Sequence, residues 1–242
     1  MSAHPAYARR GLLAAALARA EAWLLEQPDD ALEVVEPIVR SRPVVAVFGL
    51  GEGCGATTVA RALGAELAAR DSVGACAVSS LPGATALPLG TAAAARLARA
   101  LGAIPGAWAQ ASGRLCLADC GDARRLADAT RYLAPLVLDA GRVAVGGAPA
   151  TIADHVVLIA SDRIEPALAA VARASLGRVG PEPLLVVNRA ARLGPFEGKA
   201  DLLLPESRMG ARLAHAGRAP RGELGRAIDE LADRCEEPSA LA

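Results

Sequence analysis

The chain has 242 residues, of which 53% are hydrophobic and 21% charged, so it has enough apolar material for one large α/β domain with a sizeable core. Aromatic residues make up only 2%, and the core must therefore be packed from Ala, Val and Leu. The 26 basic and 26 acidic residues cancel, which argues against a protein whose whole surface binds nucleic acid or anionic lipid.

The first 42 residues form a helical N-terminal segment in our interpretation. Two arginines, a short apolar run and Ala18-Arg19-Ala20 imitate a signal peptide, but the apolar pattern continues past them at helical spacing. The apolar stripe of this helix comprises Leu13, Leu17, Ala20 and Leu24. A shorter helix follows at 31–40, and Pro43 ends the segment. We expect the stripe to pack on its own domain, with docking on a partner or a second copy as the alternative.

Short apolar runs alternate with Ala-rich helical stretches after Pro43. Seven predicted strands lie at 44–48, 74–78, 114–118, 136–140, 155–160, 183–188 and 200–205. Predicted helices lie at 58–69, 91–101, 123–133 and 165–176, and a helical stretch from 208 to 235 is interrupted near 217–222. This alternation predicts an α/β domain over 43–236, with a mostly parallel sheet and helices on both faces, and a frayed tail at 237–242. The uncharged run 72–95 is broken by Pro and Gly, so no transmembrane segment is expected.

The cysteines are odd in number and irregularly spaced. They are Cys54, Cys76, Cys116, Cys120 and Cys235. This pattern fits neither a disulfide framework nor a zinc site, so we interpret them as reduced core residues of a cytoplasmic protein.

The stretch GLGEGCGATT at 49–58 follows the first predicted strand and opens a predicted helix. Glycines let a backbone approach phosphate groups, and a helix N-terminus offers free N–H groups to them. The glycines are Gly51, Gly53 and Gly55, and Thr57 and Thr58 stand where a hydroxyl would reach Mg²⁺. A full phosphate loop carries a lysine where this chain has Ala56, and the one lysine of the chain is Lys199. The pattern predicts an anion-binding loop that lacks its cation.

The same residues also match a second pattern. Gly51-x-Gly53-x-x-Ala56 satisfies the dinucleotide fingerprint, which predicts an oxidoreductase that binds NAD(P). That pattern needs an acidic residue at the end of the second strand, where this chain has Ser79 and Ser80. A tight strand–helix turn in a scaffold without ligand is a third hypothesis.

Residues 43 to 235 resemble the ParA/MinD-like P-loop ATPases of the SIMIBI class, whose loop reads KGGxGKTT. LVLDAG at 136–141 is similar to the Walker B strand of that family, and it places Asp139 at the acidic position. PLLVVNRA at 183–190 resembles the strand whose final Asn meets adenine, here Asn188, and LLLPES at 202–207 resembles the last strand and its base-side turn at Pro205.

The resemblance implies a site for ATP or ADP with Mg²⁺. It assigns the phosphates to Gly51, Gly53, Cys54, Gly55, Ala56, Thr57 and Thr58. It further assigns Mg²⁺ to Thr57 and Asp139, catalysis through the metal shell to Asp139, and the base to Asn188 and Pro205. From the residues alone, Asp139 and Asn188 are also compatible with turn positions, and Cys54 is interpreted as a small core filler and not as a redox switch.

The departures from the family pattern favour a divergent member. Gly51 stands at the signature lysine, Ala56 at the phosphate-loop lysine, and Glu52 would place a repelling carboxylate near phosphates. We therefore expect a nucleotide-binding protein or pseudo-ATPase, akin to pilus-assembly and septum-site proteins, that regulates position or assembly through protein partners or as a homodimer. The alternatives are a slow ATPase that uses an arginine for the lysine, the oxidoreductase, and the scaffold. A cytoplasmic location is expected, with a place at the periphery of a membrane complex left open.

Charge is segregated near the C-terminus. Between Arg208 and Arg226 there are five arginines and one acid, Glu223, whereas 227–237 is acidic. The favoured interpretation is that the arginines pair with Asp229, Asp233 and Glu236-Glu237. Contact with DNA or with an acidic partner is the alternative.

Overall fold

The computed structural model describes residues 41–84, 89–143, 148–190 and 194–236. The helical segment predicted for the N-terminus lies outside these ranges except for Ser41 and Arg42, and so does the predicted tail at 237–242.

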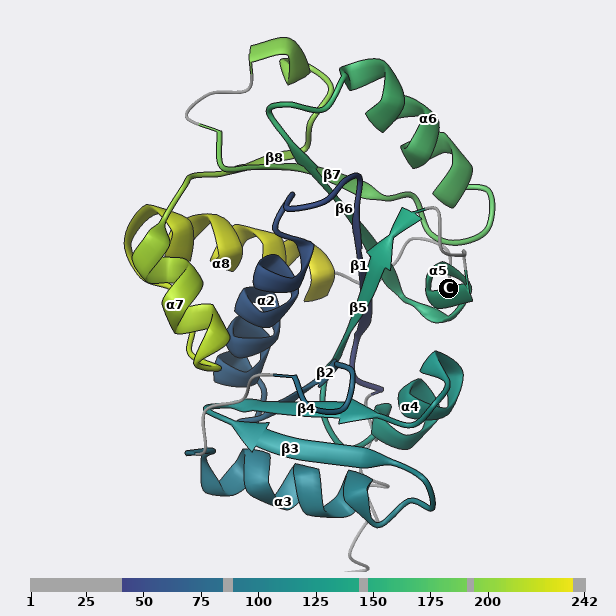
Figure 1. The fold of residues 1–242 in the computed structure, drawn as a ribbon, viewed down its shortest axis with the longest axis vertical. Coiled ribbons are helices and arrows are strands. Elements are labelled where there is room, and N and C mark those ends of the chain that lie inside the picture. The colour runs from purple at the N-terminus through teal and green to yellow at the C-terminus, as the bar shows by residue number, and fades with distance from the viewer. Residues whose placement is uncertain (1–40, 85–88, 144–147, 191–193, 237–242) are drawn as a thin grey trace, which may run out of the picture. The chain divides into compact units, whose positions relative to one another are not determined.

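The described strands form one sheet in the order β3-β4-β2-β5-β1-β6-β7-β8 (Figure 1). Their bounds are β1 (Val44–Gly49), β2 (Cys76–Ser79), β3 (Trp108–Ser112), β4 (Leu115–Asp119), β5 (Leu136–Arg142), β6 (His155–Ser161), β7 (Leu184–Asn188) and β8 (Leu202–Leu204). Every neighbouring pair is parallel except β3 and β4, which are antiparallel. The predicted mostly parallel α/β sheet is confirmed, and each of the seven predicted strands is present. The edge strand β3 was missed.

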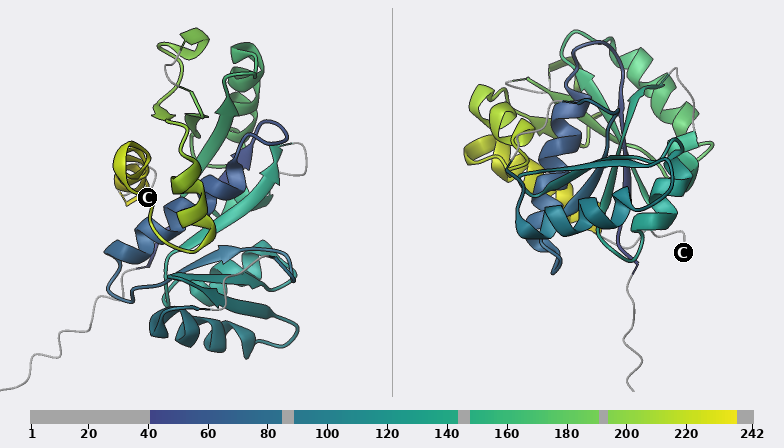
Figure 2. Two further views of the ribbon diagram at one scale, coloured as in Figure 1. Left: turned by 60° about the vertical axis from the view of Figure 1, so that its left-hand side comes forward. Right: turned by 60° about the horizontal axis from the view of Figure 1, so that its bottom comes forward.

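Helices cover both faces of the sheet. Their bounds are α2 (Ala56–Arg70), α3 (Ala92–Gly102), α4 (Ala123–Thr130), α5 (Ala148–Ile152), α6 (Pro166–Leu176), α7 (Arg208–His215) and α8 (Gly222–Glu236), with a 3₁₀ turn η2 at Gly194–Phe196. Figures 1 and 2 show α7 and α8 beside α2 on one face, with α3, α4, α5 and α6 on the other. The predicted break near 217–222 separates α7 from α8, whereas α5 was not predicted and α4 ends earlier than expected.

The central strand β1 explains how two cores form around one sheet. Side chains alternate across a strand, and every residue of β1 is buried. Val44, Ala46 and Phe48 belong to the core under α3 to α6, whereas Val45 and Val47 belong to the core under α2, α7 and α8. A strand buried on both faces reads as a continuous apolar run, which is why VVAVF was recognisable in the sequence.

An arginine at the end of α2 joins α8 to α2. Arg70 forms ion pairs with Glu66 of its own helix and with Asp229, Asp233 and Glu236 of α8. The prediction that these α8 acids pair with the arginines of 208–226 is therefore wrong, because α8 turns its acidic side towards α2. Within the described residues, none of those five arginines makes an ion pair. In the same described ranges, no helix has the length and apolar character needed to cross a bilayer.

Candidate functional site

The glycine-rich loop connects the end of β1 to the start of α2. Gly53 and Gly55 have φ values of 68° and 91°, a backbone conformation that glycine adopts at low cost. Gly55 is the N-cap of α2, and no side chain forms a capping hydrogen bond there. The first turn of the helix contains no acidic residue. The N–H groups of that turn have no intrahelical partner and could donate to an anion bound at the loop.

Asn188, at the end of β7, braces this loop from the neighbouring strand. Its side chain is buried, and Nδ2 donates a hydrogen bond of 2.8 Å to the carbonyl oxygen of Cys54. A Cβ atom added at Gly55 would lie 2.3 Å from the same Nδ2 atom. Gly55 is therefore required both for its backbone angle and for the space that Asn188 occupies.

Arg189 adds a cation to the loop, and the sequence interpretation did not identify it. Its Nη1 donates to the carbonyl oxygen of Gly53 at 3.1 Å, and its backbone N–H donates to that of Leu204 at 2.9 Å. Arg189 has a φ of 62°, which costs about 1–2 kcal/mol for a residue with a Cβ. The available signal was its position directly after Asn188, but nothing in the sequence shows that this side chain returns to the loop.

Two adjoining cavities bring the predicted site residues together. The first, of about 360 Å³, is lined by the loop and the start of α2 together with Asp139, Gly141, Arg142 and Arg189. The second, of about 220 Å³, is lined by Asn188, Pro205 and the start of α7. Thr58 and Arg189 line both cavities. Every predicted site residue lines one or both: Gly51, Gly53, Cys54, Gly55, Ala56, Thr57, Thr58 and Asp139 line the first, and Thr58, Asn188 and Pro205 the second.

Asp139 and Thr57 supply the oxygen ligands that a magnesium ion would use. Both line the first cavity, and the backbone N–H of Asp139 donates to Ser79 Oγ at 2.8 Å, which ties β2 to β5. Within the described residues there is no group of three or more His, Cys, Asp or Glu able to hold a metal. One carboxylate and one hydroxyl fit Mg²⁺ if ligand phosphates and water complete its shell, as is usual for this ion.

The carboxylate expected to repel phosphates has a partner of its own. Glu52 forms an ion pair with Arg142, the last residue of β5, and both side chains are exposed. An exposed pair contributes little to stability, but it compensates the Glu52 charge at the first cavity.

His215 of α7 contacts two residues of α2 beside the loop. His215 Nδ1 lies 3.2 Å from Nη1 of the buried Arg61, and His215 Nε2 lies 3.4 Å from Thr58 Oγ1. Burial, and then the positive charge of Arg61, lower the pKa of His215, so its ring is neutral at pH 7. Arg61 can only donate, so Nδ1 accepts and Nε2–H donates to Thr58. The Thr58 hydroxyl therefore has a partner on α7, whereas Thr57 is exposed and lines the first cavity.

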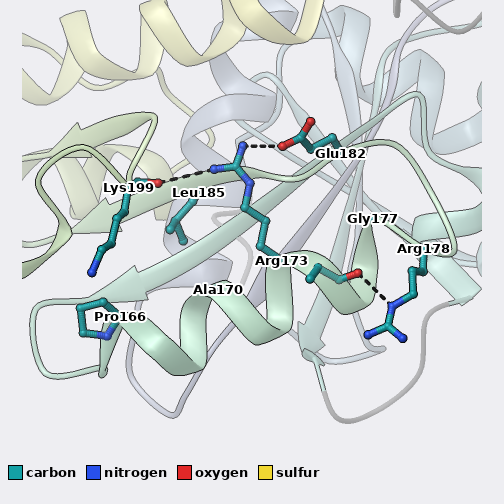
Figure 3. Close-up of a pocket in the computed structure, with 9 residues that line it drawn as sticks. Pro166, Ala170, Arg173, Gly177, Arg178, Glu182, Leu185 and Lys199 are labelled. Atoms are coloured by element: carbon teal, nitrogen blue, oxygen red, sulfur yellow. Dashed lines mark hydrogen bonds and ion pairs between the residues drawn. The ribbon is translucent and has the colours of Figure 1, made fainter.

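A larger cavity, of about 570 Å³, lies along α6 (Figure 3). Its walls include Pro166, Ala170, Leu185 and Lys199. Arg173 crosses it and forms ion pairs with Glu182 and Asp201, both at 3.0 Å. No predicted site residue lines this cavity, and Arg173, one of the three cations that line it, is already ion-paired.

The strand order counts against the dinucleotide hypothesis. In a dinucleotide-binding sheet the second strand lies directly beside the first, so an acid at its end reaches the ribose next to the loop. Here β5 lies between β1 and β2, and β2 ends in Ser79, whose hydroxyl is bonded to Asp139. The position that would bind the ribose therefore lies one strand too far from the glycine-rich loop, and a serine occupies it.

Comparison with known proteins identifies the fold. No family model and no curated protein matches the sequence. Among solved structures, the ParA family ATPase of Chlorobium tepidum TLS matches 79% of this chain and 99% of its own, with a TM-score of 0.54 and 14% identity. The septum site-determining protein MinD of Pyrococcus horikoshii OT3, solved with Mg-ADP, matches 81% of this chain and 96% of its own, with a TM-score of 0.54 and 14% identity. A chain of the MinC:MinD cell division complex of Aquifex aeolicus matches 83% of this chain and 98% of its own, with a TM-score of 0.54 and 15% identity.

These matches show an α/β fold of the P-loop NTPase type. More specifically, the chain has the fold of the ParA/MinD-like ATPases, as the resemblance of its loop and later strands had indicated. At identities of 14% and 15% the likeness is one of fold.

Proposed function

We propose that this protein binds ATP or ADP with Mg²⁺, turns ATP over slowly or not at all, and acts as a spatial or assembly regulator through protein partners. One observation carries the proposal. The glycine loop with its uncapped helix and the Asn188–Pro205 region line two adjoining cavities that share Thr58 and Arg189. A ligand with a phosphate end and a base end fits this pair of cavities.

The phosphate end rests on backbone groups. Anion binding at a helix N-terminus needs N–H groups and a close approach, and Gly53 to Thr58 supply both. Thr57 and Asp139 would hold Mg²⁺, which supplies positive charge to the phosphate oxygens when it is bound. The Mg-ADP complex of the P. horikoshii MinD, which shares this fold, supports the choice of ligand.

Slow turnover follows from the missing lysine. Ala56 brings no charge to the transferring phosphoryl group, and Arg142 is already paired with Glu52. Stabilising the charge that develops on a phosphoryl group is the main task of such sites, so its loss lowers the rate more than the affinity.

The exposed arginines of 208–226 support an anionic partner. The nearby acids of α8 form ion pairs with Arg70, so they do not compensate the charges of the five arginines. These charges are therefore available to another surface. The MinC:MinD complex shows that a protein with this fold can assemble with a different protein. We propose a protein partner with an acidic surface or a second copy of the chain, in the cytoplasm.

The test is a titration of the purified chain with ATP, ADP and NAD(P), each with and without Mg²⁺. Saturable binding of ATP or ADP with no binding of NAD(P) is expected. Binding of NAD(P) alone, or of no nucleotide, would contradict the proposal. A steady-state hydrolysis rate of roughly 1 s⁻¹ or faster, typical of ordinary enzymes, would refute slow turnover.

A further inference from the structure

Arg189 lies where the two cavities of the site meet. It lines both of them, and its Nη1 is held at 3.1 Å by the carbonyl oxygen of Gly53. Its Nη2 would lie 3.9 Å from a Cβ atom added at Gly55, so the guanidinium extends along the loop from Gly53 to Gly55. A guanidinium has five N–H donors, and the Gly53 carbonyl accepts from one of them, so the planar group can also bind a phosphate.

Arg189 brings positive charge to the part of the first cavity that adjoins the second. The rest of the first cavity has negative charge. Asp139 and Glu52 line it, and Arg142 compensates Glu52 through their ion pair. Asp139 has no such ion pair within the described residues. The cation Arg189 therefore lies at the end that adjoins the base-side cavity. The carboxylate of Asp139, whose charge also acts on the buried Arg61, lies at the other end.

We propose that Arg189 replaces the missing lysine as the phosphate-binding cation, and that the site consequently prefers a nucleoside diphosphate to a triphosphate. This inference rests on the proposed nucleotide function. A ligand whose base lies against Asn188 and Pro205 brings its first phosphates to Arg189, and each further phosphate extends towards Asp139 and Glu52. Mg²⁺ reduces the preference because it compensates these carboxylates.

Two variants separate charge from support of the loop. Arg189→Gln keeps an N–H donor for the Gly53 carbonyl but removes the charge, and Arg189→Lys keeps the charge. Losing a charge-assisted hydrogen bond is expected to weaken ADP binding roughly 10- to 100-fold in Arg189→Gln. Arg189→Lys should stay within a few-fold of the wild type. Arg96→Ala, at an exposed position of α3, is the matched control and should bind ADP as the wild type does.

The measurement is isothermal titration calorimetry of ADP and ATP, with and without Mg²⁺, with a melting temperature for each variant. The wild type should bind ADP more tightly than ATP without Mg²⁺, and Glu52→Gln should strengthen ATP binding more than ADP binding. Tighter binding of ATP to the wild type without Mg²⁺ would overturn the preference. Undiminished ADP binding by Arg189→Gln overturns only the assignment of Arg189. If Arg189→Gln and Arg189→Lys both weaken ADP binding and both lower the melting temperature, Arg189 only supports the loop. That result also overturns the assignment of Arg189 as the phosphate-binding cation. Absence of any nucleotide binding by the wild type overturns the proposed function together with this inference.

Discussion

Replacing Gly55 with alanine tests whether Asn188 and the loop occupy one tightly shared space. The φ of 91° costs a residue with a Cβ about 1–2 kcal/mol. The new Cβ would lie 2.3 Å from Asn188 Nδ2, so the amide must move and release the Cys54 carbonyl. A buried polar group left without its partner costs about 1–3 kcal/mol. The free energy of unfolding should therefore fall by about 2–5 kcal/mol when the two costs are added.

Gly53→Ala is the matched control. Gly53 also has a positive φ, of 68°, but a Cβ atom added there meets nothing within 4 Å. Only the backbone cost of about 1–2 kcal/mol should appear. Urea unfolding of both variants, followed by circular dichroism, isolates the clash as the difference between them. Equal losses of stability, or wild-type nucleotide binding by Gly55→Ala, would refute the shared space.

The remaining expectations concern charge, α8 and the thiols. Ala56→Lys should tighten ADP binding about 10-fold or more in calorimetry, as expected for a charge-assisted hydrogen bond, and no gain would mean that the loop already excludes the phosphate. Arg70→Met should lower the free energy of unfolding by about 1–3 kcal/mol in urea melts, because it breaks several partly exposed ion pairs to α8; an unchanged value would contradict that clamp. Burial raises the pKa of Cys116 and of Cys235 to about 12, so a thiol reagent at pH 8 should label both only after unfolding, and rapid native labelling would contradict their burial. If the arginine surface contacts DNA, affinity in a fluorescence assay should fall steeply with salt, and Arg212→Ala/Arg218→Ala should make that slope shallower; no binding at low salt would restrict the surface to protein or water.

Much of the sheet could be predicted because its strands are buried on both faces. The interior strands read as unbroken apolar runs, for example VVAVF in β1 and HVVLIA in β6. The edge strand β3 gives no such signal, since most of WAQAS is half-exposed and only Ser112 is buried. Helix starts could also be predicted, because their signal lies within a few residues of sequence. At the start of α3, for example, the Thr91 side chain accepts a hydrogen bond from the backbone N–H of Ala94.

The long-range parts of the site had no signal in the sequence. The spacing of glycines and threonines in the loop is local and was readable, but Asn188 lies 134 residues away from the carbonyl that it holds. The charge pattern was misleading for a similar reason. Proximity in sequence indicated pairing of the α8 acids with nearby arginines, whereas packing presents those acids to Arg70, 159 residues before Asp229.

The shape of the glycine-rich loop depends on its own glycines and on Asn188 outside it, and it does not require a charge at residue 56. In a trans peptide the carbonyl of one residue and the N–H of the next point in opposite directions. Asn188 holds the Cys54 carbonyl towards its own side chain, so the Gly55 N–H points the opposite way, away from Asn188. A lysine at position 56 would add charge to this arrangement but would not create it. Shape and charge are thus separable contributions to the proposed site, because Gly55 and Asn188 maintain the shape of the loop. Arg189 supplies the charge in our proposal, and Ala56→Lys would add a second cation without changing that shape.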